Sequence, residues 1–346
     1  MLSKKLIEAL VNFRQKRIAV FGDIILDRYI SGVTRRVSRE APVLILEKRD
    51  EDYNLGGAGN TIRNLKDIGA RVFPVSLVGK DAYGEKIKKL LENSNIDTRY
   101  IFLSAKRSTP IKTRYYAGDN HTRKQQILRV DESDENEITS SEYDLLINAL
   151  KREMSEDVDG LIISDYGAGN VTEKLIEELK GLGGRNNMFI GVDSRYRVFS
   201  FSNISFIKPN ESEFCDYMGI RNTSDLNLVF DSGKNMLSKL GVDIILLTRG
   251  SEGMILFEHG RDPWIIPAFG TKDILDGTGA GDTVISVFMM GLVSGLKYRE
   301  SAVLANIAGS IVVMKPNVAT LTYEELEKKI VSPEFDQYIE KNLQEL

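Results

Sequence analysis

Short runs of apolar, largely β-branched residues recur along this chain and alternate with longer segments of helical periodicity. The apolar runs lie at residues 17–21, 161–164, 188–193, 204–210 and 243–248. Such uninterrupted runs are typical of strands buried on both faces. Helical patterns lie at residues 57–69, 82–93, 139–153, 172–181, 211–218, 224–240 and 281–295. This alternation predicts an α/β fold with a doubly wound, mainly parallel sheet flanked by helices.

Two segments lack a long helical pattern, residues 41–49 and 108–130. The second resembles two strands joined by a turn at Gly118, Asp119 and Asn120. We therefore expect a small β-layer beside the main sheet. Because no repeat, low-complexity tract or Pro/Ser-rich linker divides the chain, we expect one domain that carries this appendage.

Charge and composition exclude several classes of protein. The 46 Lys and Arg nearly balance the 50 Asp and Glu, so the net charge of -4 gives no overall field for nucleic acid or anionic lipid. One cysteine, Cys215, cannot form an intrachain disulfide, and two histidines are too few for a typical zinc site. No apolar stretch approaches the length of a membrane span. We therefore expect a cytoplasmic protein that binds neither nucleic acid nor membrane.

A glycine-rich segment, DGTGAGDT at residues 276–283, precedes an apolar helical pattern. Glycines at a helix N-terminus let backbone N–H groups approach a phosphate, and the helix dipole favours negative charge there. The carboxylate of Asp282 would repel a phosphate unless it has another task, such as taking a proton from an attacking hydroxyl. A plain glycine turn capped by Asp is the alternative. A dinucleotide-binding loop fits less well at this late position, and the chain has no Gly-Lys-Ser/Thr sequence for a Walker loop.

A second glycine cluster, NLGGAGN at residues 54–60, also leads into a helical pattern, and Asp23 and Asp27 follow the first apolar run. The carboxyl ends of parallel strands are where α/β sheets bind ligands. Carboxylates and amides suit the hydroxyls of a polyol, although turn formation and helix capping are alternative roles for these residues.

These clusters, in this order, resemble the ribokinase-like (pfkB) carbohydrate kinases over about residues 15–330. The segment LGGAGN at 55–60 is similar to the family's glycine-pair signature, and DGTGAGD at 276–282 to its C-terminal signature. KPNESE at 208–213 resembles the family's Pro-Asn-Glu segment, and TRGSEG at 248–253 its nucleotide-binding turn. The resemblance implies a ribokinase-like fold with a β-sheet lid at approximately residues 40–55 and 108–131.

One branch of the family is closer, the D-glycero-D-manno-heptose 7-phosphate kinases. Segments at residues 22–46, 123–131 and 161–169 are similar to these enzymes. The resemblance implies transfer of phosphate from Mg-ATP to the C1 hydroxyl, in the biosynthesis of ADP-heptose. Asp282 would be the base, and the N–H groups of Gly279, Ala280 and Gly281 would hold the transferring charge. The chain ends soon after the kinase region, so we expect a separate protein to supply the nucleotidyltransferase half found in bifunctional relatives.

The resemblance also assigns the binding residues. Sugar hydroxyls would meet Asp23, Asp27, Gly57 and Asn60, and the sugar phosphate would meet cations among Arg36, Arg114, Arg123, Lys124 and Arg129. Arg195 stands where the family has a lysine, and Asp165 and Tyr166 either line the site or cap a turn. The nucleotide would contact Lys208, Asn210, Thr248, Gly250, Gly253, Thr278 and Asn306, with Glu213 near the metal. The expected cofactors are ATP and Mg²⁺, with K⁺ as an optional activator.

Two other functions compete with this hypothesis. One is a kinase of the same fold that acts on another sugar or sugar phosphate, such as a fructose phosphate. The other is a catalytically silent sugar- or nucleotide-binding regulator, which the retained Asp282 argues against. In each case the expected partners are small molecules and, through the β lid, a second copy of the chain.

Overall fold

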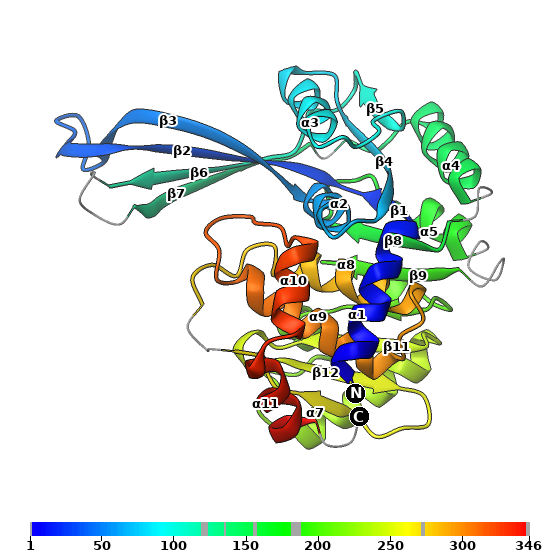
Figure 1. Cartoon of the computed structure of the whole chain (residues 1–346). Coiled ribbons are helices and arrows are strands. Elements are labelled where there is room, and N and C mark those ends of the chain that lie inside the picture. The colour runs from blue at the N-terminus through cyan, green and yellow to red at the C-terminus, as the bar shows by residue number, and fades with distance from the viewer. Residues whose placement is uncertain are drawn as a thin grey trace.

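The computed structural model describes residues 2–118, 124–134, 136–154, 158–180, 188–270 and 274–343. Its main sheet has nine strands in the order β13-β12-β11-β10-β9-β8-β1-β4-β5 (Figure 1). The strands are β1 (Arg17–Gly22), β4 (Arg71–Gly79), β5 (Ile101–Ser104), β8 (Gly160–Asp165), β9 (Phe189–Ser194), β10 (Phe206–Ile207), β11 (Ile244–Thr248), β12 (Met254–Glu258) and β13 (Trp264–Ile266). The seven strands from β5 to β11 are parallel, and β12 and β13 extend the sheet antiparallel.

Helices cover both faces of this sheet. They are α1 (Leu2–Asn12), α2 (Ala58–Asp67), α3 (Ala82–Asn93), α4 (Ser140–Met154), α5 (Glu173–Lys180), α6 (Glu211–Met218), α7 (Leu226–Leu240), α8 (Ala280–Val293), α9 (Tyr298–Val312), α10 (Tyr323–Ile330) and α11 (Pro333–Asn342). Three short 3₁₀ turns are η1 (Phe13–Gln15), η2 (Val198–Ser200) and η3 (Gly250–Glu252). Within the described part of the chain, no helix has both the length and the apolar character needed to cross a bilayer.

Two hydrophobic cores lie on the opposite faces of the sheet. In β1, Ile18 and Val20 belong to the core that contains α1, α2, α8 and α9, whereas Ala19 and Phe21 belong to the core that contains α4, α5 and α7. Successive side chains of a strand point to opposite faces. This two-sided burial explains why the sequence of β1 is apolar throughout and confirms the expected doubly wound α/β fold.

The predicted apolar runs all contain strands, although β10 is reduced to two residues. The predicted helices also appear, with ends shifted by a few residues. Sequence reasoning did not name the strand at β4 or the buried helix α9.

A second sheet projects from the main body and forms the lid, defined here as β2 (Ile24–Val37), β3 (Leu44–Gly57), β6 (Ile111–Ala117) and β7 (Gln125–Glu132), in the order β3-β2-β6-β7. Figure 1 shows these strands extending to one side of the main sheet. The lid includes residues 24–37, which sequence reasoning had not assigned to a strand. The expected turn at Asp119 and Asn120 lies outside the described residues.

Candidate active site

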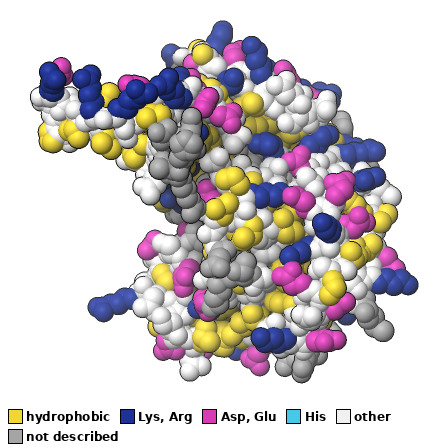
Figure 2. Space-filling model, turned by 60° about the vertical axis from the view of Figure 1, so that its left-hand side comes forward, with side chains coloured by type: hydrophobic (Ala, Val, Ile, Leu, Met, Phe, Trp, Pro, Cys, Tyr) yellow, Lys and Arg dark blue, Asp and Glu magenta, His cyan; other side chains and the backbone are white. Residues whose placement is uncertain are grey.

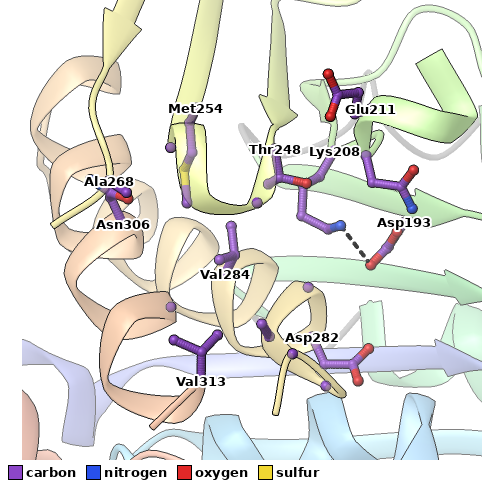
Figure 3. A pocket seen from close by; sticks show the side chains of 18 of the residues that line it. Asp193, Lys208, Glu211, Thr248, Met254, Ala268, Asp282, Val284, Asn306 and Val313 are labelled. Atoms are coloured by element: carbon purple, nitrogen blue, oxygen red, sulfur yellow. Dashed lines mark ion pairs between the residues drawn. The ribbon is translucent and has the colours of Figure 1, made fainter. Parts of the chain in front are cut away.

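The candidate site lies where the carboxyl ends of the parallel strands meet the N-terminus of α8. Strand order reverses between β1 and β8, and open α/β sheets bind ligands outside such a reversal. A cavity of about 520 Å³ opens there. Figure 3 shows Asp193, Lys208 and Asp282 on one side of it, Met254 and Ala268 on the other, and Val284 between them. The cavity therefore has a charged end and an apolar end.

Glycines bring the first turn of α8 close to its neighbours. Gly279 precedes the helix with a left-handed φ of 84°, and a Cβ there would lie 2.6 Å from the amide nitrogen of Asn60. A Cβ on Gly281 would lie 3.2 Å from Nζ of Lys208. Because the first N–H groups of a helix have no acceptor within it, this end of α8 suits an anion, and Lys208 adds a positive charge.

The turn before α8 is held by its own hydrogen bonds. The N–H of Thr278 donates to Oδ1 of Asp276 at 2.9 Å, and the N–H of Ala280 donates to the carbonyl of Gly277 at 3.3 Å. Gly277 and Ala280 line the cavity, whereas Thr278 is exposed and is not among the lining residues. The structure therefore places Thr278 in the turn and not at the cavity wall where it was expected.

Asp282 occupies the first turn of α8 and is 3% exposed. Its Oδ2 accepts a hydrogen bond from the Asn60 amide at 2.8 Å, and its Oδ1 accepts one from the Tyr166 hydroxyl at 2.7 Å. Burial, with a contribution from Asp193, raises the pKa of Asp282 to about 7, while the two hydrogen bonds and Lys208 oppose the rise. A carboxyl with a pKa near neutrality is well matched to proton transfer at neutral pH.

Tyr166 links this carboxyl to the rest of the site. Its backbone N–H donates to Oδ2 of Asp23 at 3.0 Å, and its ring lies 3.2 Å from where a Cβ on Gly57 would be. Burial first, and then the charge of Asp282, raise the pKa of Tyr166 well above its ordinary value, so the hydroxyl remains a donor. Sequence reasoning left the role of Tyr166 open, and no local pattern connects it with Asp282.

Lys208 is 3% exposed and pairs with Asp193 at 3.0 Å (Figure 3). Burial lowers the pKa of Lys208, but Asp193, Glu213 and Asp282 outweigh it and raise the pKa above its usual value. Burial and Asp193 together raise the pKa of Glu213 to about 6. The buried ammonium group thus pairs with one carboxylate and is influenced by the charges of two more.

The ends of β10 and β11 are joined beside this charged end. Asn210 forms an isolated bridge with Thr248 and caps α6 in a capping box with Glu213, whose Oε2 accepts the Asn210 N–H at 2.8 Å. In the turn after β11, Gly250 and Gly253 have left-handed φ values of 53° and 86°. A Cβ on Gly253 would overlap the backbone of residues 266–268, so only glycine fits there.

Asn306 on α9 lies at the apolar end of the cavity and is 5% exposed (Figure 3). Its amide nitrogen donates to the carbonyl of Pro267 at 2.7 Å and to the Tyr338 hydroxyl at 2.9 Å. This amide group is therefore fixed in place beside Met254 and Val313, which line the same wall.

Asp27 lies on β2 beneath the glycine pair and is 3% exposed. It forms an ion pair with Arg114 of β6, which is itself buried. A Cβ on Gly56 would overlap the Asp27 carboxylate, which explains why the first glycine of the pair is needed. Arg114 was expected to meet a substrate phosphate, but the structure pairs its charge with Asp27.

Asp23 has a different environment from the one expected. Its carboxylate is fully buried and accepts the backbone N–H groups of Tyr166, Ala168 and Asn170, each at 3.0 Å. Contact with sugar hydroxyls was expected, but these donors enclose the carboxylate because β1 and β8 lie side by side. Asp23 therefore positions the loop after β8.

Asp165 also holds strands together, although it lines the cavity. Its carboxylate accepts hydrogen bonds from Arg197 and from the Ser194 hydroxyl, both at 2.7 Å. Arg195 is exposed, lines the cavity, and donates its backbone N–H to the carbonyl of Asp165 at 3.0 Å. The segment after β9 is thus anchored to the end of β8.

Two more of the cations expected to bind phosphate, Arg36 and Arg129, lie on the lid. Arg36 is exposed near the end of β2. Arg129 on β7 is exposed and pairs with Asp131 at 2.8 Å. Lys124 donates to the Ser31 hydroxyl at 3.1 Å, and Arg123 lies outside the described residues.

Curated relatives match nearly the whole chain. The chain is 33% identical over 319 residues to the "Bifunctional protein HldE" of Desulfatibacillum aliphaticivorans and 34% identical over 320 residues to that of Haemophilus influenzae, in each case over 92% of this chain and 64% of the relative. It is 32% identical to HldE of Geotalea uraniireducens over 100% of this chain and 69% of the relative. The chain thus spans slightly less than two thirds of the first two relatives.

Solved structures share the fold at lower sequence identity. Arabidopsis thaliana ribokinase complexed with ribose and ATP superposes with a TM-score of 0.71 at 17% identity, covering 92% of this chain and 99% of that one. Phosphofructokinase-2 from Escherichia coli in complex with potassium superposes with a TM-score of 0.73 at 16% identity, covering 91% and 98%. These likenesses establish a ribokinase-like fold. Residues 15–325 match the pfkB family of carbohydrate kinases. The chain therefore belongs to the pfkB family of carbohydrate kinases.

Proposed function

We propose that this kinase phosphorylates the C1 hydroxyl of D-glycero-D-manno-heptose 7-phosphate, giving the 1,7-bisphosphate. The observation that carries the proposal is the position of Asp282, a buried carboxyl with a pKa of about 7 between the nucleotide cavity and Asn60. The choice of acceptor is supported by the segments that resemble heptose 7-phosphate kinases and by the HldE relatives, which match over more than nine tenths of the chain.

In the proposed step the acceptor oxygen attacks the γ-phosphorus of ATP. A new O–P bond forms as the bond between the γ-phosphorus and the β,γ-bridging oxygen breaks, and ADP leaves with that oxygen. The acceptor proton passes to the carboxylate of Asp282. Lys208 and the N–H groups of Gly279 and Gly281 at the start of α8 would offset the charge on the transferring group, whereas the N–H of Ala280 already donates to the carbonyl of Gly277.

Nucleotide binding is assigned to the residues along the cavity. The adenosine would lie against the apolar end, near Asn306, and the phosphates would approach Lys208. The turn at Gly250 and Gly253, together with Asn210 and Thr248, would border the nucleotide, because these residues line the cavity.

The residues present fit a magnesium ion that arrives with the nucleotide. Asp193, Glu213 and Asp282 supply more negative charge than Lys208 neutralises, and Mg²⁺ in kinases is held by one or two carboxylates together with substrate phosphates. Among the described residues, no group of three or more His, Cys, Asp or Glu side chains is arranged to hold a metal ion alone. Glu213 is a ligand candidate with one oxygen already occupied by Asn210. When bound, the ion would neutralise charge on the phosphates.

The acceptor would bind between the lid and α8. Asp27, Gly57 and Asn60 lie there, with the Asp27 carboxylate fixed by Arg114. Activation by K⁺ is proposed from the family resemblance alone. If K⁺ activates the enzyme, replacing K⁺ by Na⁺ in the assay should lower its activity.

We also propose a cytoplasmic homodimer that associates through the lid. Large hydrophobic side chains are exposed on or beside its strands: Val37, Val43, Leu44, Ile127, Leu128 and Val130. Figure 2 shows the lid projecting from the body with hydrophobic side chains along one side. An exposed apolar sheet face of this kind is typical of an interface. In analytical ultracentrifugation the wild type should sediment as a dimer. Leu128→Glu, which places a charge among these exposed hydrophobic side chains, should sediment as a monomer.

The test is ADP release from Mg-ATP with the purified protein and a panel of acceptors. We expect turnover with heptose 7-phosphate and little with fructose 6-phosphate, fructose 1-phosphate, ribose or unphosphorylated heptose. If the protein prefers a fructose phosphate, the proposed acceptor is wrong, but the proposed kinase activity stands. No ADP release with any of these acceptors would contradict the proposed reaction and favour a regulator that only binds.

A further inference from the structure

Lys112 is a cation at the junction of the lid and the main body that has no counterion of its own. It lies on β6, and its Nζ is 5.4 Å from the centre of the Tyr166 ring. The side chain is half-buried, and among the described residues no carboxylate lies within ion-pair distance of it. Its strand neighbours are Asp27 in β2 and Asp131 in β7.

Those two carboxylates are already engaged. Asp27 pairs with Arg114, and Asp131 pairs with Arg129 at 2.8 Å. Neither carboxylate beside Lys112 on the neighbouring strands β2 and β7 is therefore free to neutralise its charge. Burial lowers the pKa of Lys112, and the nearby charge of Asp27 only partly offsets this effect.

Arg195 brings a second cation toward the same place from the main sheet. Its backbone is tied to the carbonyl of Asp165, the residue before Tyr166, at 3.0 Å. The ring of the next residue, Tyr196, packs over Gly167, the residue after Tyr166. Arg195 lines the cavity, and no ion pair of its guanidinium is found in the described part of the chain. Its charge acts on Lys112 and lowers the pKa of that lysine.

We propose that Lys112 and Arg195 form the subsite that holds a phosphate group of the acceptor, with the Tyr166 ring between this subsite and Asp282. Two unneutralised cations match the charge of a phosphate monoester, which is close to -2 at neutral pH. This inference rests on the proposed function, since it requires a phosphorylated acceptor to bind beside Asp282. It assigns phosphate recognition to Lys112, a residue that no sequence motif marks, and not to Arg114 or Arg129.

The subsite also joins two parts of the molecule. Lys112 belongs to the lid and Arg195 to the loop after β9, so a phosphate bound by both would bridge lid and body. Figure 2 shows the molecule hollowed beneath the projecting lid. An acceptor without a phosphate would leave both cations unpaired, which favours phosphorylated acceptors over plain sugars.

The first experiment compares Lys112→Met with the wild type in steady-state kinetics. Loss of a charge-assisted contact is expected to raise KM for the phosphorylated acceptor by about 10- to 100-fold. The KM for ATP should stay within about twofold, because Lys112 is not among the residues that line the nucleotide cavity. Lys48→Met is the matched control, since it removes an exposed lysine from β3 of the same lid. Lys112→Arg, which keeps the charge, should recover most of the affinity.

A binding measurement separates this inference from the proposed reaction. Heptose 7-phosphate, fructose 6-phosphate and the two unphosphorylated sugars are titrated calorimetrically without ATP into wild type, Lys112→Met and Arg195→Met. Tighter binding of either sugar phosphate, lost in both variants, supports the subsite even if the heptose is not the substrate. Equal loss of phosphorylated and unphosphorylated sugars, or unchanged affinity for the phosphates, overturns it.

Discussion

The hydroxyl of Tyr166 donates a hydrogen bond of 2.7 Å to Oδ1 of Asp282. The backbone of Tyr166 is in turn held by the buried Asp23 carboxylate at the end of β1. The proposed base on α8 is therefore oriented by a residue that follows β8, more than a hundred positions earlier in the chain. Tyr166 is a positioning residue in this account.

Tyr166→Phe should move the pH profile of the enzyme. The tyrosine hydroxyl stabilises the carboxylate form of Asp282, so its loss raises the pKa of Asp282 further above about 7. Because the base works only when deprotonated, the acid-side midpoint of kcat/KM should rise by about 1 pH unit. The deficit should be largest below neutral pH and shrink toward pH 9. Tyr100→Phe, which removes a hydroxyl remote from Asp282, should leave the profile in place, and an unshifted midpoint in Tyr166→Phe would refute the positioning role.

Asp282→Asn tests the base directly. An amide cannot accept the acceptor proton, so kcat should fall by about 10²- to 10⁴-fold or more. The affinity for ATP, measured by calorimetry, should change little, because Asn preserves the size of the side chain at the start of α8. Retention of substantial activity would show that another group takes the proton.

The same variant should change how stability depends on pH. The pKa of Asp282 is about 7 in the folded state, compared with an ordinary value of 3.8. Between about pH 4 and pH 7, Asp282 is therefore protonated in the folded state but already ionised in the unfolded state. This group therefore lowers the free energy of unfolding as pH rises from about 4 to 7. Asp282→Asn should gain stability relative to wild type across that range, on the order of 4 kcal/mol by pH 8. Urea unfolding at pH 5 and pH 8 measures the gain, and a difference that does not change with pH would contradict the raised pKa.

Arg114→Met should affect all acceptors alike. The substitution leaves the Asp27 carboxylate buried without its partner, which is expected to cost about 3–5 kcal/mol of stability. The variant should lose activity toward phosphorylated and plain sugars by the same factor, because Arg114 acts through Asp27. Arg129→Met removes only an exposed ion pair and should cost less than about 1 kcal/mol. The activity of both variants is measured with the phosphorylated and the unphosphorylated form of the same sugar. If Arg114→Met loses activity only toward the phosphorylated sugar, Arg114 and not Lys112 binds the acceptor phosphate.

Local sequence patterns predict the parts of the fold that local physics determines. Strands such as β1 and β8 are buried on both faces, so an unbroken apolar run marks them. The start of α8 can be recognised in the sequence by its glycines. Residue 279 must be glycine because its backbone lies close to the Asn60 side chain. The strand β2 was missed because its sequence is apolar at one end and charged at the other, as it leaves the core to enter the lid.

The contacts of the site depend on pairings between distant strands. Asp27 meets Arg114 only because β2 and β6 lie in a particular parallel register, in which Asp27 is opposite Lys112. Lys112 and Arg114 are two residues apart and share a face of β6, so a shift of one residue would turn both side chains to the other face. Sequence reasoning therefore named Arg114 and Arg129, which the structure shows in ion pairs, and did not name Lys112.

The most direct test of the account is ³¹P NMR of the product made from Mg-ATP and D-glycero-D-manno-heptose 7-phosphate by the wild type and by Asp282→Asn. We expect a second sugar phosphorus, coupled to the C1 proton, that accumulates with ADP in the wild-type reaction and is nearly absent with the variant. A phosphate on another carbon, release of inorganic phosphate alone, or equal product from both proteins would contradict it.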